Sequence, residues 1–210
     1  MYNYDLNVNG YSIRPGADLR NADLSYSDLS LSYAYGADFN EADLRGSDLS
    51  KSNLFDANLS YSDLSYANLD QAYAVFADLT GANLQGANLY LTDLRRATLL
   101  DVNFKDANLD TTNLDEAILR NVDLSNADLG GINLNYADLE GANLSGAYLY
   151  NTNLRGANLS NVDLSYADLS STDLEGAIFD GAYLKGANIE GAILDNSDAF
   201  ILPLTGVVNY

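Results

Sequence analysis

The chain has 210 residues, of which 47% are hydrophobic, and a formal net charge of −20 from 30 acidic and 10 basic residues. It contains neither cysteine nor histidine, which excludes disulfides, zinc sites built from these residues, and catalysis by a thiol or an imidazole. Its acidity predicts repulsion from nucleic acid and anionic membranes and attraction to basic protein surfaces.

Residues 1–15 do not follow the pattern of the rest of the chain, and we predict that they cover the N-terminal end of the fold. The opening stretch from Met1 to Asp5 has neither the basic nor the apolar segment of a signal peptide. No apolar run approaches the ~20 residues of a membrane-spanning helix. These features indicate a cytoplasmic protein that does not bind membranes.

Residues 16–200 are 37 consecutive pentapeptides without a break in phase, beginning GADLR, NADLS, YSDLS. We call the fourth residue of each pentapeptide position i. It is Leu, Phe or Ile in 34 of the 37, and position i−2 is Ala, Ser, Thr or Val in 36. Position i−1 is Asp in 16 and Asn in 13, and 13 of the 16 glycines stand at i+2. A phase held this long indicates one repeated structural unit.

A period of five fits neither an α-helix, whose apolar residues recur every 3.6 residues, nor a long strand, in which they alternate. Positions i−2 and i are two apart, so they share one face of a short extended segment. Asp, Asn and Gly favour a turn at every fifth residue. We therefore predict that positions i and i−2 point inward and that i−1, i+1 and i+2 face solvent.

This A(D/N)LXX signature resembles that of the pentapeptide-repeat family over residues 16–200. The resemblance implies an all-β fold, the right-handed quadrilateral β-helix, with four pentapeptides per coil. The chain would then form about nine coils, spanning ~44 Å at the ~4.8 Å spacing between paired strands. Residues 20 apart would stack, with the alanines from Ala17 to Ala177 in one inner ladder and another made of Leu24, Leu44, Leu64, Leu84, Phe104, Leu124, Leu144, Leu164 and Leu184.

Carboxylates at i−1 would form columns on the outside. The candidate acidic interaction face has Asp23, Asp43 and Asp63 on one side and Asp28 and Asp48 on the next. A short polar side chain there can bond the backbone of the turn, which is the structural explanation. Because 13 pentapeptides have Asn instead, the fold accepts a neutral residue, and a function for the charge stays open.

Tyrosine and alanine interrupt the pattern together at two places. Tyr33 and Tyr73 replace the usual Asp or Asn, and each precedes an alanine, Ala34 or Ala74, at position i. We favour a local role in which the tyrosine compensates for the missing leucine volume. The alternative is a recognition stripe, because Tyr is enriched at interfaces.

The C-terminal end becomes apolar on its outside. Position i−1 is occupied by Ile178, Tyr183 and Ile193, and Phe200 ends the repeats. The tail, residues 201–210, carries further apolar side chains: Ile201, Leu202, Leu204, Val207 and Val208. This surface either caps the helix or docks a second copy in an end-to-end homodimer; the sequence leaves both open.

No catalytic constellation or phosphate-binding loop is present, and the paired carboxylates follow the period, so we predict a protein without enzymatic activity, metal or cofactor. One interpretation is an interaction or structural module with a basic protein partner and no direct contact with nucleic acid. The alternative is implied by the resemblance: some pentapeptide-repeat proteins are thought to mimic DNA against type II topoisomerases such as gyrase and so confer quinolone resistance. This chain lacks the loops that interrupt the coils of many such members.

Overall fold

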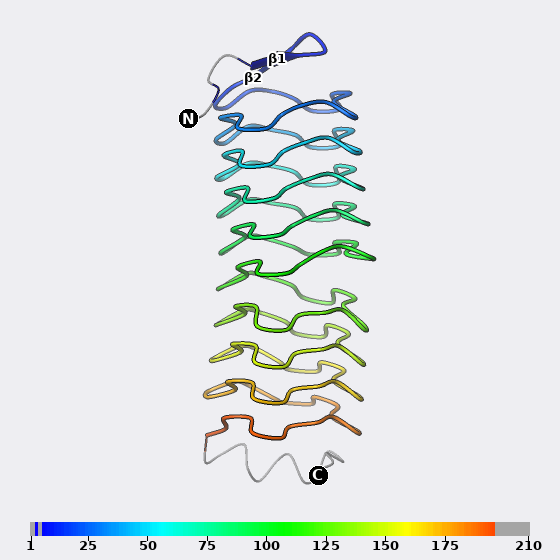
Figure 1. The fold of residues 1–210 in the computed structure, drawn as a ribbon, viewed down its shortest axis with the longest axis vertical. Helices are drawn as coiled ribbons and strands as arrows, with labels where there is room; N and C mark the ends of the chain where they lie inside the picture. Colours follow the sequence, from blue (N-terminus) through cyan, green and yellow to red (C-terminus); the bar gives the residue numbers. More distant parts are fainter. Residues whose placement is uncertain (1–2, 4–5, 196–210) are drawn as a thin grey trace. The chain divides into compact units, whose positions relative to one another are not determined.

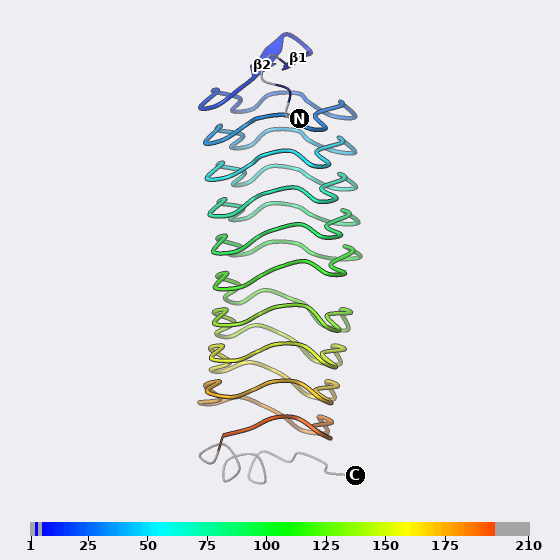
Figure 2. The ribbon, with the colours of Figure 1, turned by 60° about the vertical axis from the view of Figure 1, so that its left-hand side comes forward.

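The computed structural model describes residue 3 and residues 6–195, and the chain divides into two compact units, Met1–Asn113 and Leu114–Tyr210. Within each unit the chain winds in repeated coils, and the described residues include no helix (Figure 1, Figure 2). Isolated parallel bridges join residues 20 apart, such as Asp23 with Asp43 in the first unit and Asp123 with Asn143 in the second. Four pentapeptides therefore complete one coil, as the family resemblance implied.

The only two regular strands in the described residues form a hairpin that precedes the repeats. Strand β1, Leu6–Val8, pairs antiparallel with β2, Tyr11–Ile13. In the turn between them, the Asn9 side-chain amide donates 3.2 Å hydrogen bonds to the backbone oxygen of Asp23 and the hydroxyl of Ser27. These contacts hold the hairpin against the first coil, and we propose that it covers this end of the first unit.

The corner between two sides of a coil is a β-turn. At the first corner the amide of Ala22 donates to the carbonyl oxygen of Leu19 over 3.1 Å, and Asn21, the third residue of the turn, has a φ of 56°. A positive φ confined to the third residue is the arrangement of a type II turn. This residue is position i+2, so the left-handed backbone explains why the glycines concentrate there.

Hydrogen bonds join each coil to the coils on either side of it. The amide of Leu24 donates to the carbonyl oxygen of Asp43 over 2.8 Å, and the amide of Asp43 donates back to Ala22 over 2.9 Å. The same pair of bonds recurs along the sides of both units. Because each coil uses its neighbours to satisfy its backbone groups, a side chain's surroundings are decided by residues about 20 positions away.

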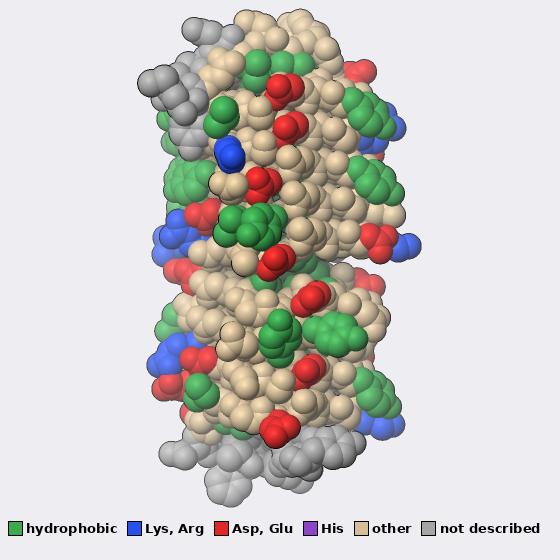
Figure 3. All heavy atoms as spheres, viewed as in Figure 1, with side chains coloured by type: hydrophobic (Ala, Val, Ile, Leu, Met, Phe, Trp, Pro, Cys, Tyr) green, Lys and Arg blue, Asp and Glu red, His purple; other side chains and the backbone are tan. Residues whose placement is uncertain are grey.

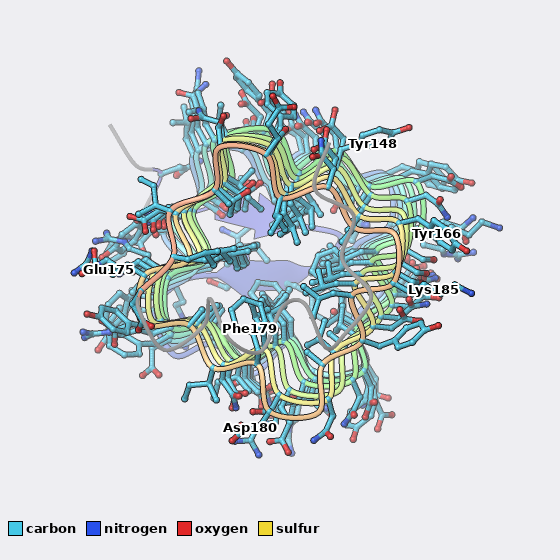
Figure 4. The ribbon with its side chains drawn as sticks, turned by 90° about the horizontal axis from the view of Figure 1, so that it is seen from below. Tyr148, Tyr166, Glu175, Phe179, Asp180 and Lys185 are labelled. Carbon is cyan, nitrogen blue, oxygen red and sulfur yellow. The ribbon has the colours of Figure 1, made fainter. Side chains whose placement is uncertain are left out.

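The core consists of positions i and i−2, as predicted. Every described member of the predicted leucine and alanine ladders is buried. Figure 4 shows the alternation in the second unit, where Phe179 points to the interior and Glu175, Asp180 and Lys185 point outward. Burying one leucine side chain stabilises a fold by ~1.5–3 kcal/mol, so the repeated leucine is the main source of stability.

The buried threonines keep their hydroxyls paired. Thr92 donates from Oγ1 to the carbonyl oxygen of Leu69 over 2.8 Å, and Thr152 donates to Leu129 over 2.6 Å. Each bond crosses from one coil to the preceding coil of the same unit. Threonine can therefore replace alanine at i−2 without leaving a buried polar group unsatisfied.

Each tyrosine at the corner position i+2 lies over a glycine of the next coil. Tyr61, with a φ of 58°, places its ring where a Cβ on Gly81 would lie, 2.6 Å from two ring carbons. The remaining four corner tyrosines have the same partner 20 residues on, in the pairs Tyr26 with Gly46, Tyr66 with Gly86, Tyr136 with Gly156 and Tyr166 with Gly186. The glycine makes room for the ring, and its own φ is positive as well.

We expect Gly81→Ala to lower the free energy of unfolding by ~1–2 kcal/mol, because alanine is strained at a φ of +67°. The loss should be smaller in a Tyr61→Ser background, which removes the ring but leaves the backbone strain. Urea denaturation of the four proteins of this double-mutant cycle measures both contributions. Equal stability of Gly81→Ala and the wild type would contradict the pairing.

Candidate interaction surface

Each candidate carboxylate holds the turn that follows it. Oδ1 of Asp43 accepts the amide of Arg45 at 3.2 Å, and Oδ1 of Asp48 accepts the amide of Ser50 at 2.9 Å. The remaining three carboxylates accept the same bond from the amide two residues later: Asp23 from Ser25, Asp28 from Ser30, and Asp63 from Ser65. This is an Asx turn, in which a short side chain replaces a backbone acceptor. The candidate face thus has a structural role at each of its positions.

Asparagine makes the same bond. Oδ1 of Asn53 accepts the amide of Phe55 at 3.0 Å, and Oδ1 of Asn58 accepts that of Ser60 at 3.1 Å. The turn therefore needs a side-chain oxygen at i−1 and does not need its charge. Where aspartate stands at i−1, the negative charge is additional to what the fold requires.

The predicted acidic columns are present in the first unit. Parallel bridges join Asp23 to Asp43 and Asp43 to Asp63, and another joins Asp28 to Asp48 on the next side of the coil. Paired residues of this kind lie ~4.8 Å apart along the coil axis. Figure 3 shows carboxylates recurring from coil to coil on the face turned towards the viewer.

Amide groups tie the columns together wherever asparagine follows. The side-chain amide of Asn68 donates to Asp48 Oδ1 over 3.0 Å, and that of Asn83 donates to Asp63 Oδ1 over 3.1 Å. A carboxylate following another carboxylate cannot donate such a bond, and like charges directly opposite each other are destabilising. The stack of Asp23, Asp43 and Asp63 is therefore less favourable than a mixed Asp and Asn column.

Arg45 neutralises part of the acidic column. Its Nε donates to Asp43 Oδ1 over 2.8 Å and lies 3.9 Å from Asp63 Oδ2. The acidic columns at i−1 did not predict this contact, because Arg45 stands at i+1. The pair is half-exposed, so it contributes only ~0–1 kcal/mol. Of the candidate carboxylates, Asp43 accepts hydrogen bonds from an arginine, whereas Asp23, Asp28 and Asp48 accept them from serine groups.

Local hydrogen bonds keep several carboxylates ionised. Side-chain and backbone bonds from Arg20 lower the pKa of Asp18 to about 2. The Arg45 side chain lowers the pKa of Asp43, and the Ser30 hydroxyl, followed by its amide, lowers that of Asp28. All three groups are therefore anionic at neutral pH.

The apolar positions at the C-terminal end do not form one patch. Ile178, Tyr183 and Ile193 are exposed to 48%, 50% and 55%, but they stand on three different sides of the same coil, each bridged to the coil before it. Phe200 and the tail positions Ile201, Leu202, Leu204, Val207 and Val208 lie outside the described residues. The cap and the end-to-end homodimer both stay predictions, because the tail that either would use lies outside the described residues.

Two further kinds of site can be judged for the described part of the chain. It contains no group of three or more acidic side chains placed to hold a metal ion. It also contains no helix long and apolar enough to cross a membrane.

The coil geometry agrees with a comparison against family models. Copies of the pentapeptide-repeat model match this chain over residues 16–50, 52–99, 75–110, 87–126, 99–135, 123–161 and 163–198. The chain belongs to the pentapeptide-repeat family. The right-handed quadrilateral β-helix that the resemblance implied is thereby confirmed.

One solved structure superposes well on this chain, and a second is similar in sequence. Full-length QnrB1, a plasmid-mediated fluoroquinolone resistance protein, superposes with a TM-score of 0.63 at 22% identity, covering 90% of this chain and 94% of that one. HetL, a pentapeptide-repeat protein involved in heterocyst differentiation regulation in the cyanobacterium Nostoc sp. strain PCC 7120, is 34% identical with a TM-score of 0.43, covering 92% and 85%. No curated protein matches the chain.

Replacing the acidic column with asparagine should leave this pentapeptide-repeat fold intact. The column variant combines Asp23→Asn, Asp43→Asn and Asp63→Asn. It keeps the side-chain oxygens that accept the turn amides. Two new side-chain amide bonds between coils can form, and the repulsion between like charges falls. We expect the free energy of unfolding to be unchanged or to rise by about 1 kcal/mol in urea denaturation. A loss of more than about 2 kcal/mol would mean that the fold depends on the carboxylates.

The pair of Asp18 and Arg20 should make stability depend on pH. Since the pKa of Asp18 is lowered to about 2 in the fold, the pair stabilises above the unfolded pKa of ~3.9 and loses this effect as the pH falls through about 2. The stability difference between the wild type and Arg20→Gln should therefore shrink from pH 4 to pH 2. An Asp18 carboxyl that titrates near 4 by NMR in the wild type would contradict this.

Proposed function

We propose that this chain is a non-enzymatic interaction module whose acidic columns bind a basic protein surface. Its five candidate carboxylates are Asp23, Asp43 and Asp63 on one side of the first unit and Asp28 and Asp48 on the adjacent side. The observation that carries the proposal is that asparagine makes the same turn bond as aspartate at i−1. The negative charges of Asp23, Asp43 and Asp63 are not needed for the turns and repel one another within the column. Binding of a partner would explain why aspartate stands there.

The columns suit a partner with regularly spaced cations. Carboxylates recur at ~4.8 Å along a backbone held by hydrogen bonds, so little conformational entropy is lost when a partner binds. The net charge of −20 adds long-range attraction for a basic protein and repels nucleic acid.

The second candidate function is mimicry of DNA towards a type II topoisomerase such as gyrase. It is favoured by the same columns of fixed negative charge, and by a fold shared with QnrB1, a fluoroquinolone resistance protein. At 22% identity that likeness concerns the fold alone. The two candidates differ in the partner and share the acidic face, so one set of variants tests both.

The decisive experiment is DNA supercoiling by gyrase with increasing amounts of three proteins: the wild type, the column variant Asp23→Asn, Asp43→Asn, Asp63→Asn, and a control variant. The control, Asp163→Asn, Asp168→Asn, Asp173→Asn, removes the same total charge but takes one carboxylate from each of three sides of one coil. Both variants keep the turn acceptors at i−1.

Inhibition or quinolone protection by the wild type and the control, lost in the column variant, would establish DNA mimicry as the function of the column. Absence of any effect at micromolar protein would remove that candidate. Immobilising the three proteins then tests the first candidate, which expects a basic partner retained by the wild type and the control only. Equal retention by all three would refute a role for the column.

A further inference from the structure

Four aromatic rings gather on the outside of the first unit. Phe55 stacks on Tyr35 with ring centroids 5.4 Å apart, stacks on Tyr73 at 5.8 Å, and meets Phe76 edge-on at 5.5 Å. Phe55 therefore contacts all three of the other rings. Together with Val75, which stands one coil below Phe55, these side chains form what we call the aromatic strip.

The i+1 members of the strip stand at a position that is polar in most other pentapeptides. Tyr35, Phe55 and Val75 occupy i+1 in three consecutive coils on the side of Ala34 and Ala74, whereas i+1 is serine in many other pentapeptides, including those ending at residues 25, 30, 50, 60 and 65. Tyr35 and Phe76 are exposed to 43% and 44%, Phe55 and Tyr73 are half-buried, and Val75 is buried. The buried positions i and i−2 complete the core without these rings, so the strip is additional to what the fold requires.

The backbone beneath the strip is regular. The amide of Gly36 donates to the carbonyl oxygen of Phe55 over 2.8 Å, that of Asp56 donates to Val75 over 3.0 Å, and that of Phe76 donates to Arg95 over 3.1 Å. The rings also hold one another in place. A partner therefore meets a surface that is already ordered, which lowers the entropic cost of binding.

The strip already contacts one guanidinium group. Cζ of Arg96 lies 5.5 Å from the centroid of the Phe76 ring, within the range of a cation–π interaction. Along the chain, Asp56 directly follows Phe55, and Asp78 follows Phe76 by two residues. Arg95 comes next after Val75 in the same column, and its side chain is paired with Asp93. A ring that accepts a guanidinium group, on a chain with a net charge of −20, favours a ligand that carries cations beside apolar groups.

We propose that the aromatic strip is a docking site for a protein segment in which arginine alternates with large apolar side chains. The apolar side chains would cover the rings, and the guanidinium groups would lie over exposed ring faces. The proposal rests on the proposed function for the idea of a basic protein partner, but it assigns a different surface and adds an apolar anchor.

Charge complementarity selects this occupant over a second copy of the chain. Two copies would each bring a net charge of −20 to the interface, and like charges oppose association. The mutual stacking of Tyr35, Phe55 and Tyr73 covers ring faces that a sugar would need. Aromatic and arginine side chains are the commonest hot spots of protein interfaces, which agrees with a peptide segment.

The test uses a synthetic peptide, acetyl-Arg-Trp-Arg-Trp-Arg-amide, and a matched peptide with serine in place of tryptophan. The strip variant is Tyr35→Ser, Phe55→Ser, Phe76→Asn, which introduces residues found at equivalent positions of other pentapeptides. The control variant, Tyr26→Asn, Tyr61→Asn, Tyr66→Asn, removes as many exposed rings from corners away from the strip. Calorimetric titration at physiological salt gives Kd for each protein and peptide.

We expect the strip variant to bind the tryptophan peptide at least tenfold more weakly than the wild type, and the control variant to stay within about twofold. The serine peptide should bind all three proteins equally weakly. Equal affinity of the wild type and the strip variant, or equal losses in both variants, would overturn the proposal. Should the strip variant fail to fold, Phe76→Asn alone must still weaken binding.

The column variant Asp23→Asn, Asp43→Asn, Asp63→Asn separates this proposal from the proposed function. Peptide binding that survives in it but is lost in the strip variant supports the strip, whatever the outcome with gyrase. The opposite pattern, loss in the column variant and retention in the strip variant, overturns the strip and leaves the acidic columns as the binding surface.

Discussion

The hydrogen bonds between successive coils determine which side chains can meet. An amide such as that of Leu24 bonds a carbonyl almost one coil ahead, at Asp43, and the amide of Asp43 bonds Ala22 behind it. This fixes a register of 20 residues, so an outward side chain has its nearest neighbours at n−20 and n+20. Stacks of leucine, asparagine or aspartate all result from that one constraint. The side chains in each stack decide whether it stabilises or destabilises the fold.

Asparagine and aspartate show this difference clearly. At i−1 both accept the amide two residues on, but only asparagine can also donate to the oxygen of the preceding coil, as Asn68 does to Asp48. A column of asparagines is therefore self-complementary, whereas Asp23, Asp43 and Asp63 repel one another and are partly relieved by Arg45. Selection for stability alone would favour the asparagine column, which is why these carboxylates are the most informative polar residues on the first unit.

The sequence predicted the core because the period of five acts on every coil. The inward ladders at i and i−2, the stacking at 20 residues and the turn at i+2 all follow from that period and from the resemblance it carries. The hairpin of β1 and β2 could not be predicted, because residues 1–15 have no repeat to fix their register. The positions of Ile178, Tyr183 and Ile193 on three sides could have been, since their spacing of five and ten residues already separates them.

Relations at a distance of 20 were the ones that sequence reasoning missed. All five corner tyrosines are followed 20 residues later by glycine, a signal that is visible only once the register is known. The aromatic strip is of the same kind: Tyr35 and Phe55 are 20 apart, and Tyr73 and Phe76 reach the same ring from the next coil. Tyr33 and Tyr73 had suggested compensation for Ala34 and Ala74, yet the Tyr73 ring stacks on Phe55 outside the core.

In the first unit, the two carboxylate columns and the aromatic strip lie on three successive sides of the coil. The column of Asp23 occupies one side, the column of Asp28 the next, and the aromatic strip the side after that. Positions that hold serine or asparagine elsewhere are occupied there by groups that cost stability or expose apolar surface. Because the backbone beneath them is the same as beneath the polar positions, packing gives no reason for the exchange. The partner proposed above, which combines positive charge with apolar anchors, would bind both kinds of side chain on neighbouring sides of the coil.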